Sequence, residues 1–199
     1  MALSFSFLGV RVKISFLLIV LLALFAYCDK SGLMLLAISA ALIHELGHIV
    51  MAEALGLGVK ELYFAPIGIR MILKKPLSIV NTSRKVAILS AGCVINLVLF
   101  AVFMLFSQKN AALIHLITAL FNFLPAGTLD GGRILYEILS IRLDAGKAQK
   151  ITDLVSLFSA AALFLLGSLV LVYSGYNFSL LITSIYLAIT VIMRQKKLN

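Results

Sequence analysis

The sequence predicts an all-α polytopic membrane protein of about six transmembrane helices, with a short β-hairpin at the cytosolic face. Of its 199 residues, 62% are hydrophobic and only 13% are charged, whereas about a quarter of the residues in soluble domains are charged. A spanning helix needs about 20 mostly apolar residues, so a chain of this length has room for about six. We therefore expect residues 1–199 to form a single transmembrane domain.

Six apolar runs are bounded by charged or turn-forming residues. The first run is not followed by the small residues of a cleavage site, so we expect it to stay as the first helix. The fourth run is short because Pro125-Ala126-Gly127 interrupts it, and apolar residues resume at Leu129. Broken helices at membrane depth are tolerated where the backbone lines a protein cavity, so this break is expected to face a site. The six runs are 14–27, 33–55, 85–106, 111–124, 151–173 and 178–193.

The distribution of basic residues predicts the orientation in the membrane. If the N-terminus is cytosolic, all 17 Lys and Arg residues except Lys30 and Lys109 lie on the cytosolic side. The positive-inside rule favours this arrangement, so we expect an integral, multi-pass membrane protein with both termini in the cytosol. Topology and attraction to anionic lipids of the bilayer then explain the net charge of +9, without a nucleic-acid partner.

Two stretches depart from the helical pattern. Apolar segments on either side of Pro66 indicate a short hairpin from Val59 to Leu73. Apolar and polar residues alternate from Val10 to Ser15, as is typical of a strand. The alternative for residues 59–76 is an interfacial loop whose apolar side chains dip into the lipid.

The motif His44-Glu45-Leu46-Gly47-His48 lies near the middle of the second run. Residues four apart face the same side of a helix, so both imidazoles can bind one ion, and Glu45 can accept a proton from water on it. Zinc suits this arrangement, because three protein ligands leave a fourth position for water. A charge at mid-bilayer costs at least ~2.5–3.5 kcal/mol, so ionisable groups there are presumed functional. We therefore expect a zinc site.

The third zinc ligand has to come from another segment. Glu53 is out of phase with the His pair and nearer the cytosolic end, which indicates an interfacial carboxylate. Asp130 is the other acidic residue at membrane depth, and Gly131 and Gly132 would let its carboxylate approach another helix closely. The alternative is that Asp130 only caps the helix that resumes there.

These motifs resemble the site-2 protease family of intramembrane zinc metalloproteases. In that family an HExxH helix and an Asp-Gly motif two spans later share one zinc, as the second run and Asp130-Gly131-Gly132 would do here. Six spans and the basic ending Arg194-Gln195-Lys196-Lys197 resemble, more narrowly, the stage IV sporulation FB-type proteases of endospore formers.

The resemblance implies a role for each matching position. The zinc ligands would be His44, His48 and Asp130, and the residue that activates water would be Glu45. Asn122 and Pro125 would shape the substrate cleft. Asn96, in a small-residue motif of the third run, would face the site, although Cys93 stands where relatives often have Pro. For both Asn residues the alternative is a hydrogen bond between helices.

The function implied by the resemblance is hydrolysis of a peptide bond within or beside the membrane. The substrate would be a membrane-associated precursor of a sporulation sigma factor of the sigma-K type, and membrane inhibitor or regulator proteins would be further partners. A general site-2 protease would instead cleave anti-sigma factors or signal-peptide remnants. A membrane zinc transporter is disfavoured because the sequence shows one compact site rather than ligands along a path, and the intact Glu45 disfavours an inactive scaffold.

Overall fold

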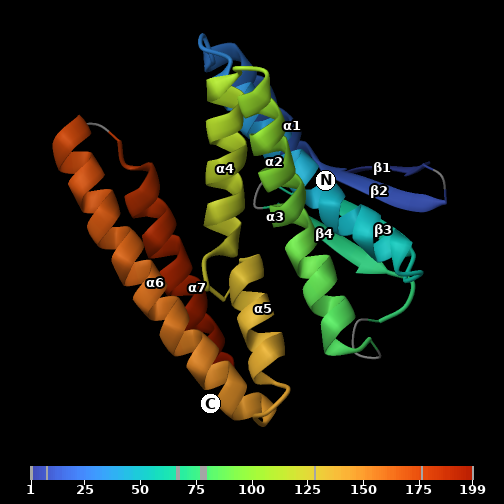
Figure 1. Ribbon diagram of the computed structural model, residues 1–199. Coiled ribbons are helices and arrows are strands. Elements are labelled where there is room, and N and C mark those ends of the chain that lie inside the picture. Colours follow the sequence, from blue (N-terminus) through green and yellow to red (C-terminus); the bar gives the residue numbers. More distant parts are fainter. Residues whose placement is uncertain are drawn as a thin grey trace. The chain divides into compact units, whose positions relative to one another are not determined.

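The computed structural model describes residues 2–7, 9–65, 68–76, 80–127, 129–175 and 177–198. In these ranges the elements are β1 (Ala2–Phe7), β2 (Val10–Ser15), α1 (Phe16–Cys28), α2 (Leu33–Ala54), β3 (Val59–Ala65), β4 (Gly68–Leu73), α3 (Thr82–Leu105), α4 (Lys109–Phe123), α5 (Asp130–Leu139), α6 (Ala145–Ser174) and α7 (Ser179–Leu198) (Figure 1). The chain divides into two compact units, Met1–Leu120 and Phe121–Asn199.

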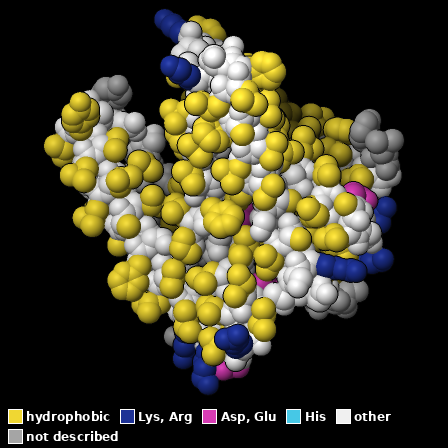
Figure 2. Space-filling model, viewed as in Figure 1, with side chains coloured by type: hydrophobic (Ala, Val, Ile, Leu, Met, Phe, Trp, Pro, Cys, Tyr) yellow, Lys and Arg dark blue, Asp and Glu magenta, His cyan; other side chains and the backbone are white. Residues whose placement is uncertain are grey.

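Each of the six predicted apolar runs contains a helix, but the first run was predicted to begin two residues too early, because Ile14 and Ser15 belong to β2. Three of the helices, α2, α3 and α6, are long and apolar enough to cross a membrane. Many Leu, Val, Ile and Phe side chains on their surfaces are exposed, and hydrophobic side chains cover much of the helical surface in Figure 2. The expectation of a multi-pass membrane protein is therefore confirmed. The number of six spans and the cytosolic position of both termini stay predictions.

The first unit contains a four-stranded sheet in the order β1-β2-β3-β4. β1 pairs antiparallel with β2, β2 parallel with β3, and β3 antiparallel with β4. The predicted hairpin from Val59 to Leu73 is thus confirmed as β3 and β4, and the interfacial-loop alternative is wrong. The all-α prediction is also wrong, because β1 and β2 extend the hairpin to a mixed sheet. The protein is mostly helical with this sheet added.

Charged side chains join the strands and tie the sheet to α2. Lys13 Nζ on β2 lies 2.8 Å from Glu61 Oε1 on β3, and Arg11 Nη1 lies 3.8 Å from Glu61 Oε2. The hydrogen bond from Lys13 holds the pKa of the Glu61 carboxyl below its usual value. Beyond the end of α2, the backbone N–H of Val59 donates to Glu53 Oε1 at 2.6 Å. Glu53 therefore anchors β3 to α2.

The cores of both units are built mainly from small and aliphatic residues. In the first unit, Ala52 of α2 and Ile88 of α3 pack with Leu57 and Val80, and residues of β4 pack against this cluster. In the second unit α6 and α7 run side by side (Figure 1). Gly167 permits this close packing, because a Cβ there would lie 2.8 Å from the backbone nitrogen of Leu181.

Candidate metal centre

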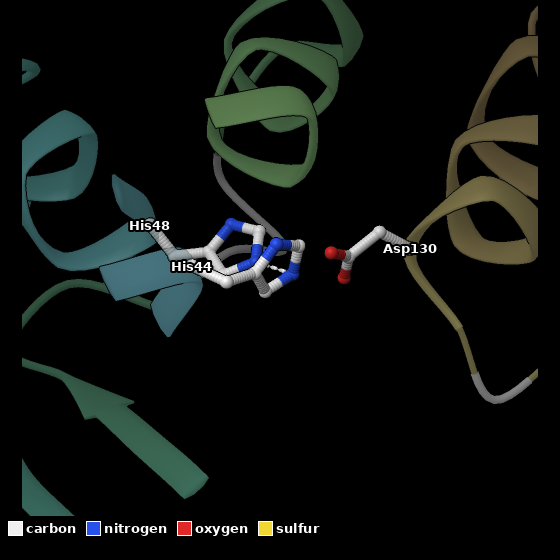
Figure 3. Close-up of side chains that lie close together, drawn as sticks. All are labelled: His44, His48 and Asp130. Atoms are coloured by element: carbon white, nitrogen blue, oxygen red, sulfur yellow. Dashed lines mark hydrogen bonds between the residues drawn. The ribbon is translucent and has the colours of Figure 1, made fainter. Parts of the chain in front are cut away.

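Two histidines lie one turn apart on α2, and both are buried. Their rings meet edge to face at an interplanar angle of 86°, and His44 Nε2 lies 3.2 Å from His48 Nε2 (Figure 3). Zinc binds imidazole nitrogen at 2.0–2.1 Å, so two nitrogens on a tetrahedral ion are about 3.3 Å apart. The separation of the two Nε2 atoms therefore fits ligation of one ion by both.

The hydrogen bond of His48 determines which of its nitrogens can ligate a metal. His48 Nδ1 lies 2.7 Å from the backbone carbonyl oxygen of Ile88 on α3. A carbonyl can only accept, so Nδ1 carries the proton and the lone pair is on Nε2. Such a bond from a histidine to a backbone carbonyl commonly fixes the orientation of a metal-binding ring.

Helix α3 approaches the His pair at a glycine. A Cβ at Gly92 would lie 2.7 Å from His44 Cε1 and 2.7 Å from His48 Nε2, and a Cβ at Gly47 would lie 2.8 Å from the backbone oxygen of Ala91. Any side chain at Gly92 would therefore occupy the space beside the two rings. The small residues of this segment were noted from the family resemblance alone, and the close crossing of α2 and α3 is the physical reason for them.

Asn96, on the same helix as Gly92, lies beside the first histidine. It is fully buried, and its Nδ2 lies 3.4 Å from His44 Nδ1. Its Oδ1 lies 2.9 Å from Nδ1 of His115, a buried residue on α4. Glu45 follows His44 on α2 and is half-buried.

In the second unit, Asp130 is the first residue of α5 and is buried. The N-cap position belongs to Leu129, which makes no side-chain capping bond. The first turn of a helix favours a negative charge because of the helix dipole. Asp130 therefore lies in the first turn of α5. The alternative interpretation had placed it at the cap position of this helix.

The two glycines after Asp130 lie against the backbone of the break. A Cβ at Gly131 would lie 2.1 Å from the backbone oxygen of Phe123, and a Cβ at Gly132 would lie 2.2 Å from that of Ala126. The missing side chains let α5 start directly against the backbone of the break. Asn122 lies in the last turn of α4, and Pro125 lies in the break itself.

Side chains from α6 and α7 hold the peptide groups of the break. The N–H of Gly127 donates to Ser156 Oγ at 2.7 Å, and Arg194 Nη1 lies 3.4 Å from the carbonyl oxygen of Gly127. Arg194 also forms an ion pair with the buried Asp153. This network was not predicted from the sequence, although an acidic residue in the fifth apolar run was a signal for it.

His44 and His48 in the first unit and Asp130 in the second unit are all buried (Figure 3). Two imidazoles and one carboxylate form a donor set that catalytic zinc sites use. The residues present therefore fit a zinc ion.

The structure matches a solved structure over nearly its whole length. It superposes on the site-2 protease from Methanocaldococcus jannaschii with a TM-score of 0.67 and 23% sequence identity, covering 97% of this chain and 94% of that one. The chain has the site-2 protease fold. The fold that the sequence resemblance implied is thereby confirmed.

Sequence comparison adds a relative with a stated activity. A zinc metalloprotease of Methanocaldococcus jannaschii is 28% identical over 167 residues, which cover 77% of this chain. The matched region spans 46% of that protein, so the chain covers about half the length of this relative. No family model matches the sequence.

Proposed function

We propose that this chain is an intramembrane zinc metalloprotease that hydrolyses a peptide bond in a membrane-associated protein. The observation that carries the proposal is the His pair on an apolar helix, with its Nε2 atoms 3.2 Å apart and Glu45 next in sequence to His44. The site-2 protease fold and the similarity to a zinc metalloprotease support it. Co-expression with a candidate membrane substrate, followed by detection of a cleaved product, tests it.

The residues of the site would divide the reaction among them. His44, His48 and Asp130 would hold the zinc, which supplies a Lewis acid that lowers the pKa of water and polarises the scissile carbonyl. Glu45 takes a proton from the attacking water as the new C–O bond forms. Glu45 then donates this proton to the leaving nitrogen as the C–N bond breaks, which returns its carboxylate.

Replacing Asp130 with Ala is expected to weaken zinc binding more than about 100-fold and to abolish cleavage. Losing a supporting residue already costs 10–100-fold in metal affinity, and Asp130 is proposed as a ligand. Asp130→Asn would retain an amide oxygen and should keep weak binding. Zinc content after dialysis, measured by atomic spectrometry, checks both variants.

The control for Asp130→Ala is Asp144→Ala. Asp144 is an exposed N-cap residue whose carboxylate accepts a hydrogen bond from the N–H of Lys147 at the start of α6. Its replacement should cost about 1 kcal/mol of stability and leave the zinc content unchanged. Full zinc and full cleavage in Asp130→Ala would show that the third ligand is a different residue.

The proposed route for the substrate is the outer edge of the sheet. A substrate helix resists cleavage because its carbonyls are hydrogen-bonded, so it has to be extended first. In the sheet, β3 is paired on both sides. Among the described strands, β4 has only β3 as a neighbour. An extended peptide can pair with such an edge through main-chain hydrogen bonds, without requiring a particular sequence.

A proline scan along β4 is expected to distinguish residues whose N–H faces the free edge of the strand from residues whose N–H faces β3. Proline at positions whose N–H points away from β3 should lower cleavage about 2- to 10-fold per lost bond and leave zinc content intact. Proline at the alternate positions should disturb the β3–β4 pairing instead. Arg70, Met71 and Ile72 are the positions to replace, with Ser4→Pro on the opposite edge strand as control. Equal cleavage at every position would remove β4 from the substrate route.

For the substrate itself we propose a sporulation sigma-factor precursor of the sigma-K type, with membrane inhibitor or regulator proteins as further partners. The support for this choice is the resemblance of the sequence motifs to the sporulation subgroup. Anti-sigma factors and signal-peptide remnants are the alternative substrates. A zinc transporter has less support, because one group of metal-binding residues was found in the described part of the chain.

A further inference from the structure

A row of hydrogen-bonding side chains extends from the His pair into α3 and α4. Asn96 stands between two histidines, with Nδ2 at 3.4 Å from His44 Nδ1 and Oδ1 at 2.9 Å from His115 Nδ1. All three side chains are at most 4% exposed. The ring of His115 also stacks on Phe103, with centroids 5.3 Å apart. The two histidines therefore meet opposite ends of one buried amide.

The amide of Asn96 couples the tautomers of the two histidines. One end of an amide only donates and the other only accepts, so a half-turn of the group exchanges what each histidine meets. With Nδ2 toward His44, the Nδ1 of His44 is an acceptor and its proton lies on Nε2. With Oδ1 toward His44, the proton lies on Nδ1 and the lone pair of Nε2 is available.

Metal binding needs the second of these arrangements. His44 Nε2 faces His48 Nε2 at 3.2 Å, so Nε2 is the atom that would bind zinc, and Nδ1 must then carry the proton. The donor end of Asn96 turns to His115 in this arrangement, and His115 can accept through Nδ1 while it keeps its proton on Nε2. A side chain without an acceptor at this position would leave the buried amide donor unpaired.

We propose that His115 is a positioning residue for the metal centre: acting through Asn96, it stabilises the tautomer of His44 that presents Nε2 to zinc. His115 itself touches neither the metal nor the substrate. A histidine suits this position because it can either donate or accept through Nδ1, so Asn96 can turn without losing its partner. This inference rests on the proposed function, because it assigns His44 as a zinc ligand.

The test compares zinc dissociation constants, measured by competition with a chromogenic chelator on the purified full chain in detergent. His115→Phe keeps a ring that can stack on Phe103 but removes the hydrogen bond, and we expect zinc binding to weaken about 10-fold. His115→Gln offers an amide donor and acceptor to Asn96, and we expect it to stay within about 3-fold of the original protein. If His115→Phe does not fold, His115→Leu takes its place.

Two further variants separate the hydrogen bond from packing. Phe103→Leu removes the stacking partner of His115 and should leave zinc binding within about 2-fold. In an Asn96→Leu background, His115→Phe should cause no additional loss, because residues that act through one another are not additive. A loss in Phe103→Leu equal to that in His115→Phe, or full additivity with Asn96→Leu, would overturn the proposal.

The outcome also distinguishes this inference from the proposed function. If the unmodified chain binds no zinc, the proposed function fails. If the unmodified chain binds zinc and cleaves its substrate, while His115→Phe has the same dissociation constant, only the positioning role of His115 fails.

Discussion

Replacing Glu45 with Gln is expected to lower the rate of peptide hydrolysis about 10²- to 10⁴-fold while zinc stays bound. Gln has nearly the same size and shape, but its amide cannot take a proton from water or return one to the leaving nitrogen. The proposed ligands His44, His48 and Asp130 are unchanged in this variant. Cleavage of a co-reconstituted substrate, followed by mass spectrometry of the products, gives the rate, and metal analysis of the same preparation gives the zinc content.

The control for Glu45→Gln is Glu53→Gln on the same helix. Glu53 accepts the N–H of Val59 through Oε1, and Gln retains an oxygen for that bond. This variant should therefore cleave at close to the original rate. A Glu45→Gln protein that cleaves normally would exclude Glu45 as the general base, and one that also loses zinc would show that Glu45 helps to bind the metal.

Gly92→Ala is the structural change with the largest expected effect on the metal centre. The added Cβ would lie 2.7 Å from His44 Cε1, from the backbone oxygen of His44 and from His48 Nε2. Because one contact is with backbone, rotation of a side chain cannot relieve all three, so α3 has to move away from α2. We expect zinc affinity to fall at least about 100-fold, since misplacing supporting groups alone costs 10–100-fold.

Gly146→Ala is the matched control for Gly92→Ala. Gly146 lies in the first turn of α6, and the nearest atom to an added Cβ is Asp144 Oδ2, at 3.4 Å. Alanine in place of glycine within a helix stabilises it by about 0.5–1 kcal/mol, so this variant should be at least as stable as the original and should bind zinc normally. Unchanged zinc binding in Gly92→Ala would mean that the close crossing of α2 and α3 does not shape the site.

The parts of the fold that the sequence predicted correctly have strong local signals. Hydrophobic runs identified the helices because the bilayer demands long apolar segments. Pro125-Ala126-Gly127 identified the break before α5, and two apolar segments identified β3 and β4. The HExxH motif identified the His pair because residues four apart necessarily face one side of a helix.

The features that the sequence analysis missed depend on pairing between distant segments. β1 alternates Ser4 and Ser6 with apolar residues, but this short pattern was not identified as a strand before its pairing with β2 was known. The partners of His115 and Arg194 lie on other helices, at Asn96, Asp153 and Gly127. No local pattern in the sequence specifies which helices pack together, so these contacts required the structure.

The most direct test of the central claim is removal and restoration of zinc in the purified, reconstituted protein. A strong chelator should stop substrate cleavage, and one equivalent of zinc per chain should restore it, because His44, His48 and Asp130 are proposed to hold a single ion. The same zinc added to Glu45→Gln should bind without restoring cleavage. Cleavage that continues at its full rate in metal-free protein would contradict the account.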